Sequence, residues 1–124
     1  MRYLVTMEQI EAATTASSQQ AAAQHLEQRV IPHDEALIKL VGENKILAGG
    51  IMVGRRGAAF IVEVASNEEL SWLLQSLPLW GLENVNVIPL ENFEERVAQN
   101  RRKLEKLKAH SGTKSDTDQV VLVL

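Results

Sequence analysis

The chain has 124 residues, a formal net charge of −3 and no cysteine. This length suits one domain with a buried core. The negative net charge gives no general attraction to nucleic acid or to an anionic membrane, and no apolar run is long enough to cross a bilayer. Without cysteine there is no disulfide, thiol nucleophile or thiolate metal ligand. The N-terminus is too polar for a signal peptide, so we expect a cytoplasmic protein.

The first third of the chain predicts a strand followed by a helix. Residues 2–7 alternate, which places Tyr3, Val5 and Met7 on one face of a strand. After a loop that ends near residue 17, apolar residues recur at helical spacing through residue 40. Pro32 lies inside this pattern and lacks a backbone N–H, so we expect a kink or a short break near Val30.

The middle of the chain predicts a hairpin, a second helix and a further strand. Two strand-like runs, 46–54 and 58–65, flank a glycine-bounded turn that holds Arg55 and Arg56. Ser66 with Glu69 three residues later has capping-box spacing and predicts the start of a helix over 66–77. Residues 84–90 alternate as a strand, which Pro89 places at an edge or an end.

The C-terminal part adds a helix and a short apolar run. An apolar stripe over residues 93–107 predicts the helix, and a polar linker follows it. Residues 120–124 have high strand propensity, so we expect them to pair with an exposed sheet edge of this or a neighbouring subunit. The alternative is that these residues were left by cloning.

This order of elements predicts an α+β fold of the ferredoxin-like type, an antiparallel sheet with helices on one face. We expect this domain and its C-terminal helix to span residues 1–109, and the linker and tail strand to span 110–124. The other sheet face would expose Leu4, Ile61 and Ile88. A second copy of the sheet would cover them, so we predict a homodimer, or a multiple of dimers, with a shared cavity: a dimeric α+β barrel.

A resemblance to a known family supports this fold. The segment "FIVEVASNEELSWLLQSLPLW", within residues 43–90, resembles the muconolactone isomerase family of the dimeric α+β-barrel superfamily. The most specific part is "LPLW", because family members carry Leu-Pro-Leu and an aromatic residue there. The resemblance implies an isomerase of small acidic lactones that needs no metal or cofactor. The family carries basic or imidazole side chains on the first strand, where this chain has Leu4 and Thr6.

Glu63 is the first candidate for a catalytic residue. It alternates with Ile61, so it shares the predicted cavity face with Leu4 and Thr6. Burial there would raise the pKa of its carboxyl group toward neutrality, as a base that moves a proton near a carbonyl requires. The alternative is a solvated Glu63 or one that is ion-paired with the arginines of the hairpin turn.

Other candidate site residues come from the helices and the turn. His33 interrupts an apolar stripe and is a candidate proton partner of Asp34 or Glu63, or else a buried histidine with satisfied hydrogen bonds. Arg55 and Arg56 are candidates to bind an anionic ligand, although such pairs are more often solvated. Trp72 and Trp80 would supply an apolar wall to the cavity. No pair of His or carboxylate residues has helical metal-ligand spacing, so we predict no metal site.

The leading hypothesis is therefore a cofactor-free isomerase or cyclase-like enzyme that moves a proton on a small carbonyl or lactone compound. A non-catalytic module that binds a small ligand or forms oligomers is the first alternative, and Leu4 and Thr6 favour it. A cofactor-free monooxygenase is the second. Whether Glu63 and His33 line one enclosed cavity separates these hypotheses, because the enzyme hypothesis weakens sharply if the two residues contact solvent or lie apart.

Overall fold

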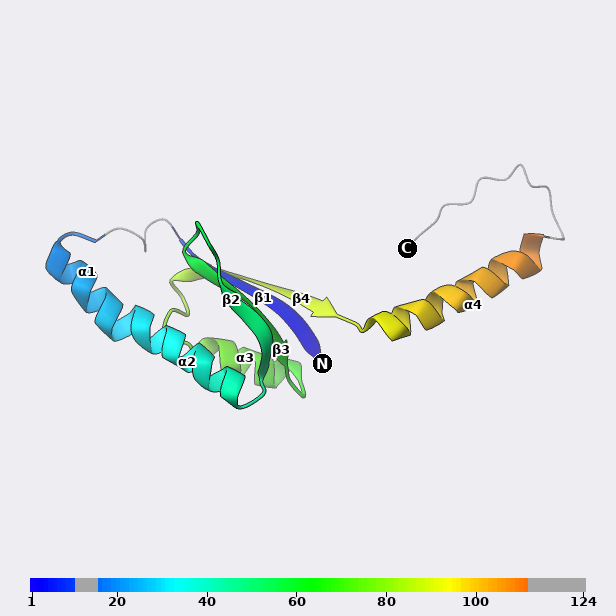
Figure 1. Ribbon diagram of the computed structural model, residues 1–124, viewed down its shortest axis with the longest axis horizontal. Coiled ribbons are helices and arrows are strands. Elements are labelled where there is room, and N and C mark those ends of the chain that lie inside the picture. The colour runs from blue at the N-terminus through cyan, green and yellow to red at the C-terminus, as the bar shows by residue number, and fades with distance from the viewer. Residues whose placement is uncertain (11–15, 112–124) are drawn as a thin grey trace. The chain divides into compact units, whose positions relative to one another are not determined.

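The computed structural model of the chain describes residues 1–10 and 16–111 (Figure 1). The chain divides into two compact units, residues 1–90 and 91–124, so the C-terminal helix belongs to the second unit. The first unit contains β1 (Arg2–Gln9), α1 (Gln19–His25), η2 (Leu26–Val30), α2 (Ile31–Gly42), β2 (Ile46–Ile51), β3 (Gly57–Glu63), α3 (Asn67–Gln75) and β4 (Glu83–Leu90). The second unit contains α4 (Phe93–Ser111).

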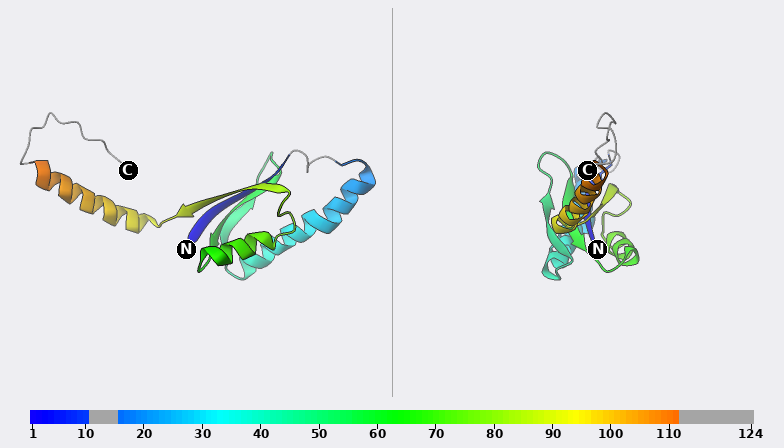
Figure 2. Two further views of the ribbon diagram at one scale, coloured as in Figure 1. Left: turned by 180° about the vertical axis from the view of Figure 1, so that it is seen from behind. Right: turned by 90° about the vertical axis from the view of Figure 1, so that its right-hand side faces the viewer.

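The four strands form one antiparallel sheet in the order β2-β3-β1-β4. This is the strand order of a split β-α-β fold, and the predicted α+β ferredoxin-like class is confirmed. Figure 2 shows α2 and α3 on the same side of the sheet. Tyr3, Val5 and Met7 are buried on that side, as their alternation predicts, and α3 packs its leucines against them.

At the start of α3, the hydrogen bond that the N-cap side chain accepts in the predicted capping box is confirmed. The Ser66 hydroxyl accepts a hydrogen bond from the Glu69 N–H at 3.1 Å. The Glu69 carboxylate accepts from the N–H of Ala65 at 2.7 Å and pairs with Lys45 at 2.6 Å. These contacts satisfy amide groups that a helix start leaves free, so α3 has a fixed beginning.

Of the two alternatives predicted near Val30, a kink or a short break, the break does not occur, and the helix is irregular there. The helix continues from Gln19 to Gly42 through the π-helical turn η2, in which the Ile31 N–H donates to the Leu26 carbonyl. A π turn can accommodate a residue whose backbone cannot make the i→i−4 hydrogen bond of an α-helix. Here the π turn precedes Pro32, which has no N–H to donate. His33 follows directly and is the buried residue of α2.

The opposite face of the sheet is apolar and open in the first unit, as predicted. Register places Leu4 beside Ile61 on β3 and beside Ile88 on β4. Leu4 and Ile61 are half-buried, and Ile88 is 48% exposed. The cover by a second copy stays a prediction.

The second unit is described as far as α4. The Asn92 side chain accepts a hydrogen bond from the Glu95 N–H at 2.7 Å, which fixes the helix start. Its apolar stripe is exposed, with Phe93, Val97, Leu104 and Leu107. The predicted tail strand over residues 120–124 lies outside the described residues. Within 1–10 and 16–111, no helix is long and apolar enough to span a membrane.

Candidate active site

A cavity of about 800 Å³ opens on the helix-covered side of the sheet. It lies among α1, η2, the start of α2, the hairpin turn before β3 and the segment that leads into β4. We call it the polar cavity because its lining includes His25, His33, Asp34, Arg55, Arg56 and Glu83. Titratable groups gathered in one cleft mark a candidate functional site.

His33 is held in one orientation by a backbone donor. The Leu79 N–H donates a hydrogen bond to His33 Nδ1 at 3.2 Å. An N–H group can only donate, so Nδ1 accepts and the neutral ring carries its proton on Nε2. Burial lowers the pKa of His33. The Asp34 carboxylate acts in the opposite direction, but its effect is smaller. His33 is therefore a neutral hydrogen-bond donor through Nε2.

Glu83 faces that donor from the first residue of β4. Its side chain is 2% exposed, and Oε1 lies 3.5 Å from His33 Nε2. That separation exceeds an ordinary N–H···O hydrogen bond, and within the described part of the chain Oε1 has no hydrogen-bond partner. Burial raises the pKa of Glu83 to about 7, with a smaller contribution from the Asp34 charge. Near neutral pH both protonation states of this carboxyl group are populated.

The segment after α3 creates this arrangement. Pro78 follows the helix end, the Trp80 N–H donates to the Leu77 carbonyl at 2.9 Å, and the Leu82 N–H donates to the Leu79 carbonyl at 3.0 Å. Gly81 has φ of 88°, which favours glycine. These successive turns bring the Leu79 N–H to His33 and start β4 at Glu83. The "LPLW" motif thus positions the two groups.

The structure also places both arginines of the hairpin turn at the polar cavity with His33. Arg55 and Arg56 line it, whereas the sequence pattern predicts them at a cavity on the Glu63 face of the sheet. The Arg55 guanidinium pairs with the Glu8 carboxylate at 3.0 Å, and its side chain is largely exposed.

Glu63 lies elsewhere. It is on the open face of the sheet, where its carboxylate pairs with Arg2 Nε at 2.9 Å and lies 3.9 Å from the N-terminal ammonium. Its side chain is 43% exposed. The alternative of an ion-paired Glu63 describes this geometry, although the partner is Arg2 in place of Arg55 or Arg56. The structure does not bring Glu63 and His33 together, because they occupy opposite sides of the sheet.

The remaining candidates also lie outside the polar cavity. Leu4, Thr6 and Ile61 share the open face with Glu63. Trp72 is 71% exposed on α3 and Trp80 is 43% exposed, and neither lines the polar cavity. Leu79, between Pro78 and Trp80, contributes to the lining instead.

A sequence profile of the muconolactone delta-isomerase family matches residues 1–96. The chain belongs to this family. A solved muconolactone isomerase is 22% identical with a TM-score of 0.60, over 74% of this chain and 90% of that one. The 5-chloro-2-hydroxyhydroquinone dehydrochlorinase from Burkholderia phenoliruptrix, solved with 2,5-dihydroxybenzoquinone, is 18% identical with a TM-score of 0.54, over 77% and 98%. Both likenesses concern the fold. No curated protein sequence matches significantly.

In this member of the muconolactone delta-isomerase family, sequence reasoning missed Glu83. A signal for it exists, because Glu83 alternates with Val85 and Val87 and so continues the core-facing side of β4. It also missed His25, whose Nε2 is buried without a hydrogen-bond partner among the described residues. The described residues include no cluster of three His, Cys, Asp or Glu that could hold a metal ion.

Proposed function

We propose that this chain is a cofactor-free isomerase that moves a proton between two carbon atoms of a small unsaturated lactone or related carbonyl compound. The observation that carries the proposal is the enclosed Glu83 carboxyl group beside the Nε2 donor of His33. Membership of the muconolactone delta-isomerase family supports this reaction class. The name of the similar solved structure, muconolactone isomerase, agrees with it.

Glu83 would act as the base and then as the acid. In its ionised form it accepts a proton from a ring carbon. That C–H is acidic because the anion left behind is conjugated with the lactone carbonyl. The electron pair of that C–H bond forms a new C=C bond, and negative charge moves to the carbonyl oxygen. The protonated Glu83 then returns the proton to another carbon of the conjugated system, which restores the carbonyl and shifts the double bond. A pKa near 7 suits both steps at neutral pH.

His33 would stabilise the intermediate. Its Nε2–H is a fixed donor because the Leu79 N–H occupies Nδ1. A neutral imidazole can donate to the oxyanion of the dienolate without giving up its proton. The two residues therefore have separate roles, with proton transfer at Glu83 and charge stabilisation at His33.

Arg55 and Arg56 would bind an acidic group on the substrate. They line the cavity that holds Glu83, and a guanidinium group pairs well with a carboxylate. Glu63 has no role in this proposal. Its carboxylate is paired with Arg2 on the other face of the sheet, where it meets neither His33 nor the polar cavity.

The test is an isomerisation assay. Unsaturated γ-lactones with and without a carboxylate group are incubated with the protein, and movement of the double bond is followed by NMR. We expect turnover by the wild-type chain and a loss of about a hundredfold or more in Glu83→Gln, the usual scale for a general acid–base group. Glu63→Gln is the matched control and should retain turnover. Lactones that bind without any double-bond movement would indicate a ligand-binding module and contradict the proposal.

A further inference from the structure

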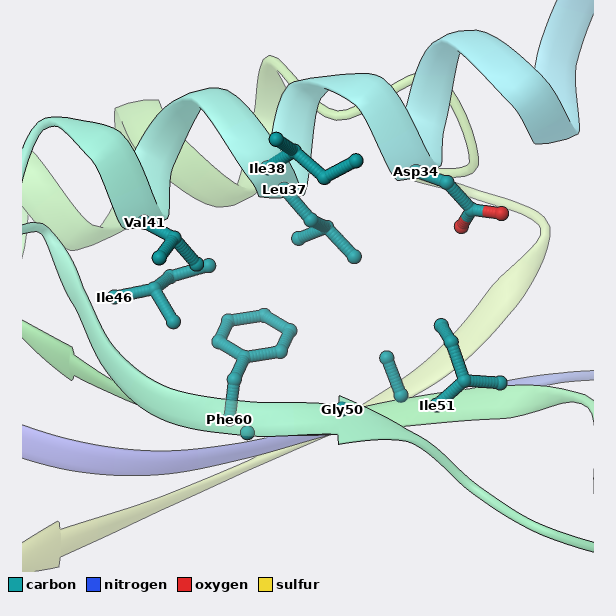
Figure 3. A pocket seen from close by; sticks show the side chains of 10 residues that line it. Asp34, Leu37, Ile38, Val41, Ile46, Gly50, Ile51 and Phe60 are labelled. Atoms are coloured by element: carbon teal, nitrogen blue, oxygen red, sulfur yellow. The ribbon is translucent and has the colours of Figure 1, made fainter.

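A second cavity, of about 270 Å³, lies between α2 and the β2–β3 hairpin (Figure 3). We call it the apolar cavity. Leu37, Ile38 and Val41 of α2 face Ile51 of β2 and Phe60 of β3 across it, with Asp34 at one end. Asp34 is the charged residue of its lining.

The backbone of β2 explains why this space is empty. Gly49 pairs with Phe60 and has φ of 145°, and a Cβ there would lie 2.4 Å from the Ala59 carbonyl oxygen. No side chain can therefore occupy position 49. Ala58, the partner of Ile51, contributes a methyl group alone. Space beside the Phe60 ring stays open and is bordered by apolar side chains, of which Ile38, Val41 and Ile51 are also exposed to solvent.

The apolar cavity adjoins the polar cavity. Asp34, Ile51 and Ala58 line both. The two cavities are therefore adjacent, on the two sides of these shared residues. The volume of about 270 Å³ is below the roughly 300–1,000 Å³ that accommodates a whole ligand, so it suits one substituent.

We propose that the apolar cavity binds a hydrophobic substituent of the substrate, a short alkyl chain or a phenyl ring, while the carbonyl end of the substrate lies at His33 and Glu83. This inference rests on the proposed function and specifies its substrate class. Transfer of such a group from water to apolar side chains stabilises the complex, by about fourfold in affinity for each buried methylene. The substrate is therefore a substituted lactone and not a small polar one.

Binding of saturated γ-lactones tests the inference without requiring turnover. The probes are γ-butyrolactone, the same ring carrying a four-carbon alkyl chain, and the same ring carrying a phenyl group. Each probe is titrated by NMR. We expect the two substituted probes to bind at least tenfold more tightly than γ-butyrolactone. Their added groups should perturb the amide signals of Val41 and Phe60. All three probes should perturb those of Leu79 and Glu83.

Two substitutions at Val41, which is 53% exposed and so tolerates change, sharpen the test. Val41→Trp fills the cavity and should abolish the gain from the substituent. Val41→Ala widens the cavity and should favour longer alkyl chains. Lys39→Trp adds the same ring to an exposed position of α2 outside the cavity lining, and it should keep the wild-type preference.

Equal affinities across the series, or no binding of any probe, would overturn the inference. So would a Val41→Trp variant that keeps the substituent preference. A Val41→Trp variant whose main effect is on self-association would show that a second copy of the chain occupies the groove, which also overturns it. If the saturated substituted probes bind as expected but their unsaturated counterparts are not isomerised, the inference about ligand class stands and the proposed function fails.

Discussion

The backbone N–H of Leu79 donates a hydrogen bond to Nδ1 of His33, which lies 46 residues earlier in the sequence, at 3.2 Å. This contact joins the turn after α3 to the helix on the other side of the polar cavity. It fixes the imidazole proton on Nε2, and Nε2 is the atom that faces Glu83. One main-chain group thus determines the chemistry that His33 can perform.

Substitutions at His33 separate its two nitrogen atoms. In His33→Asn the side-chain oxygen can replace Nδ1 as the acceptor for Leu79, but no group replaces the Nε2 donor. We expect this variant to fold with near wild-type stability and to lose about a hundredfold or more in turnover, the scale of one lost oxyanion donor. His33→Gln can place an amide N–H near the Nε2 position and should retain more activity. His33→Ala leaves the Leu79 N–H without a partner and should lower the free energy of unfolding by about 1–3 kcal/mol.

Kinetics of the two amide variants with a turned-over lactone, together with urea denaturation of all three variants, check these outcomes. Wild-type turnover in His33→Asn would show that Nε2 donates to nothing in the reaction. If His33→Ala is as stable as the wild type, the hydrogen bond from the Leu79 N–H does not contribute to the stability of the fold.

Glu83 should make stability depend on pH. Its pKa rises from an ordinary 4.5 to about 7 in the folded chain, so the folded state binds this proton more tightly than the unfolded state. The ionised Glu83 carboxylate destabilises the folded state because it is buried. This destabilisation is absent below pH 4.5, grows between pH 4.5 and 7, and is complete above pH 7. At full size it is about 3 kcal/mol. Glu83→Gln removes it and should be more stable than the wild type above pH 7.

Urea denaturation of the two proteins between pH 4 and pH 9 measures this difference. His33 titrates in the opposite sense, since its lowered pKa weakens the folded state as the pH falls below its ordinary value of 6.5. The difference between Glu83→Gln and the wild type isolates the Glu83 contribution, because His33 is present in both. A constant difference across the pH range would contradict a raised pKa for Glu83.

The open face of the sheet should join two copies of the chain. Leu4, Ile61 and Ile88 form an apolar surface on the first unit, and a second sheet would bury it. Sedimentation at low micromolar concentration should show a dimer or a multiple of one. Ile88→Lys should shift the equilibrium toward monomer, whereas Val53→Lys, at a fully exposed turn position, should not. A stable wild-type monomer would mean that the dimeric barrel does not form.

Much of the fold could be predicted from local patterns. Tyr3, Val5 and Met7 face the core because alternation in a strand allows two faces, one of which the helices must cover. Ser66 and Glu69 predict the start of α3 because capping depends on a few adjacent residues. The pattern around Pro32 does not distinguish a π turn from a break, since both relieve the same missing hydrogen bond.

The candidate site could be predicted in part. His33, Arg55 and Arg56 have recognisable signals, and all three line the polar cavity, although the sequence pattern predicts the cavity itself on the Glu63 face of the sheet. Glu83 does not stand out, because its importance depends on a contact with His33 that only the folded chain creates.

Glu63 shows a second reason why the sequence was insufficient. Alternation correctly assigns it to the face opposite Phe60, but periodicity cannot indicate on which side of the sheet a cavity forms. Its ion pair with Arg2 spans 61 residues of sequence and follows from the β1–β3 register. Such long-range pairs are not visible in local patterns.

Hydrogen–deuterium exchange on an unsaturated γ-lactone in D₂O tests the central claim, proton transfer at Glu83, most directly. NMR follows the loss of the acidic C–H signal with wild-type protein, Glu83→Gln and Glu63→Gln. We expect wild-type exchange to rise with pH through about 7, as Glu83 ionises, and to level off above it. Exchange with Glu63→Gln should follow the same pH curve. Exchange with Glu83→Gln should be slower by about a hundredfold or more. Exchange that is unchanged in Glu83→Gln but lost in Glu63→Gln would contradict the account and place the base on the open face of the sheet.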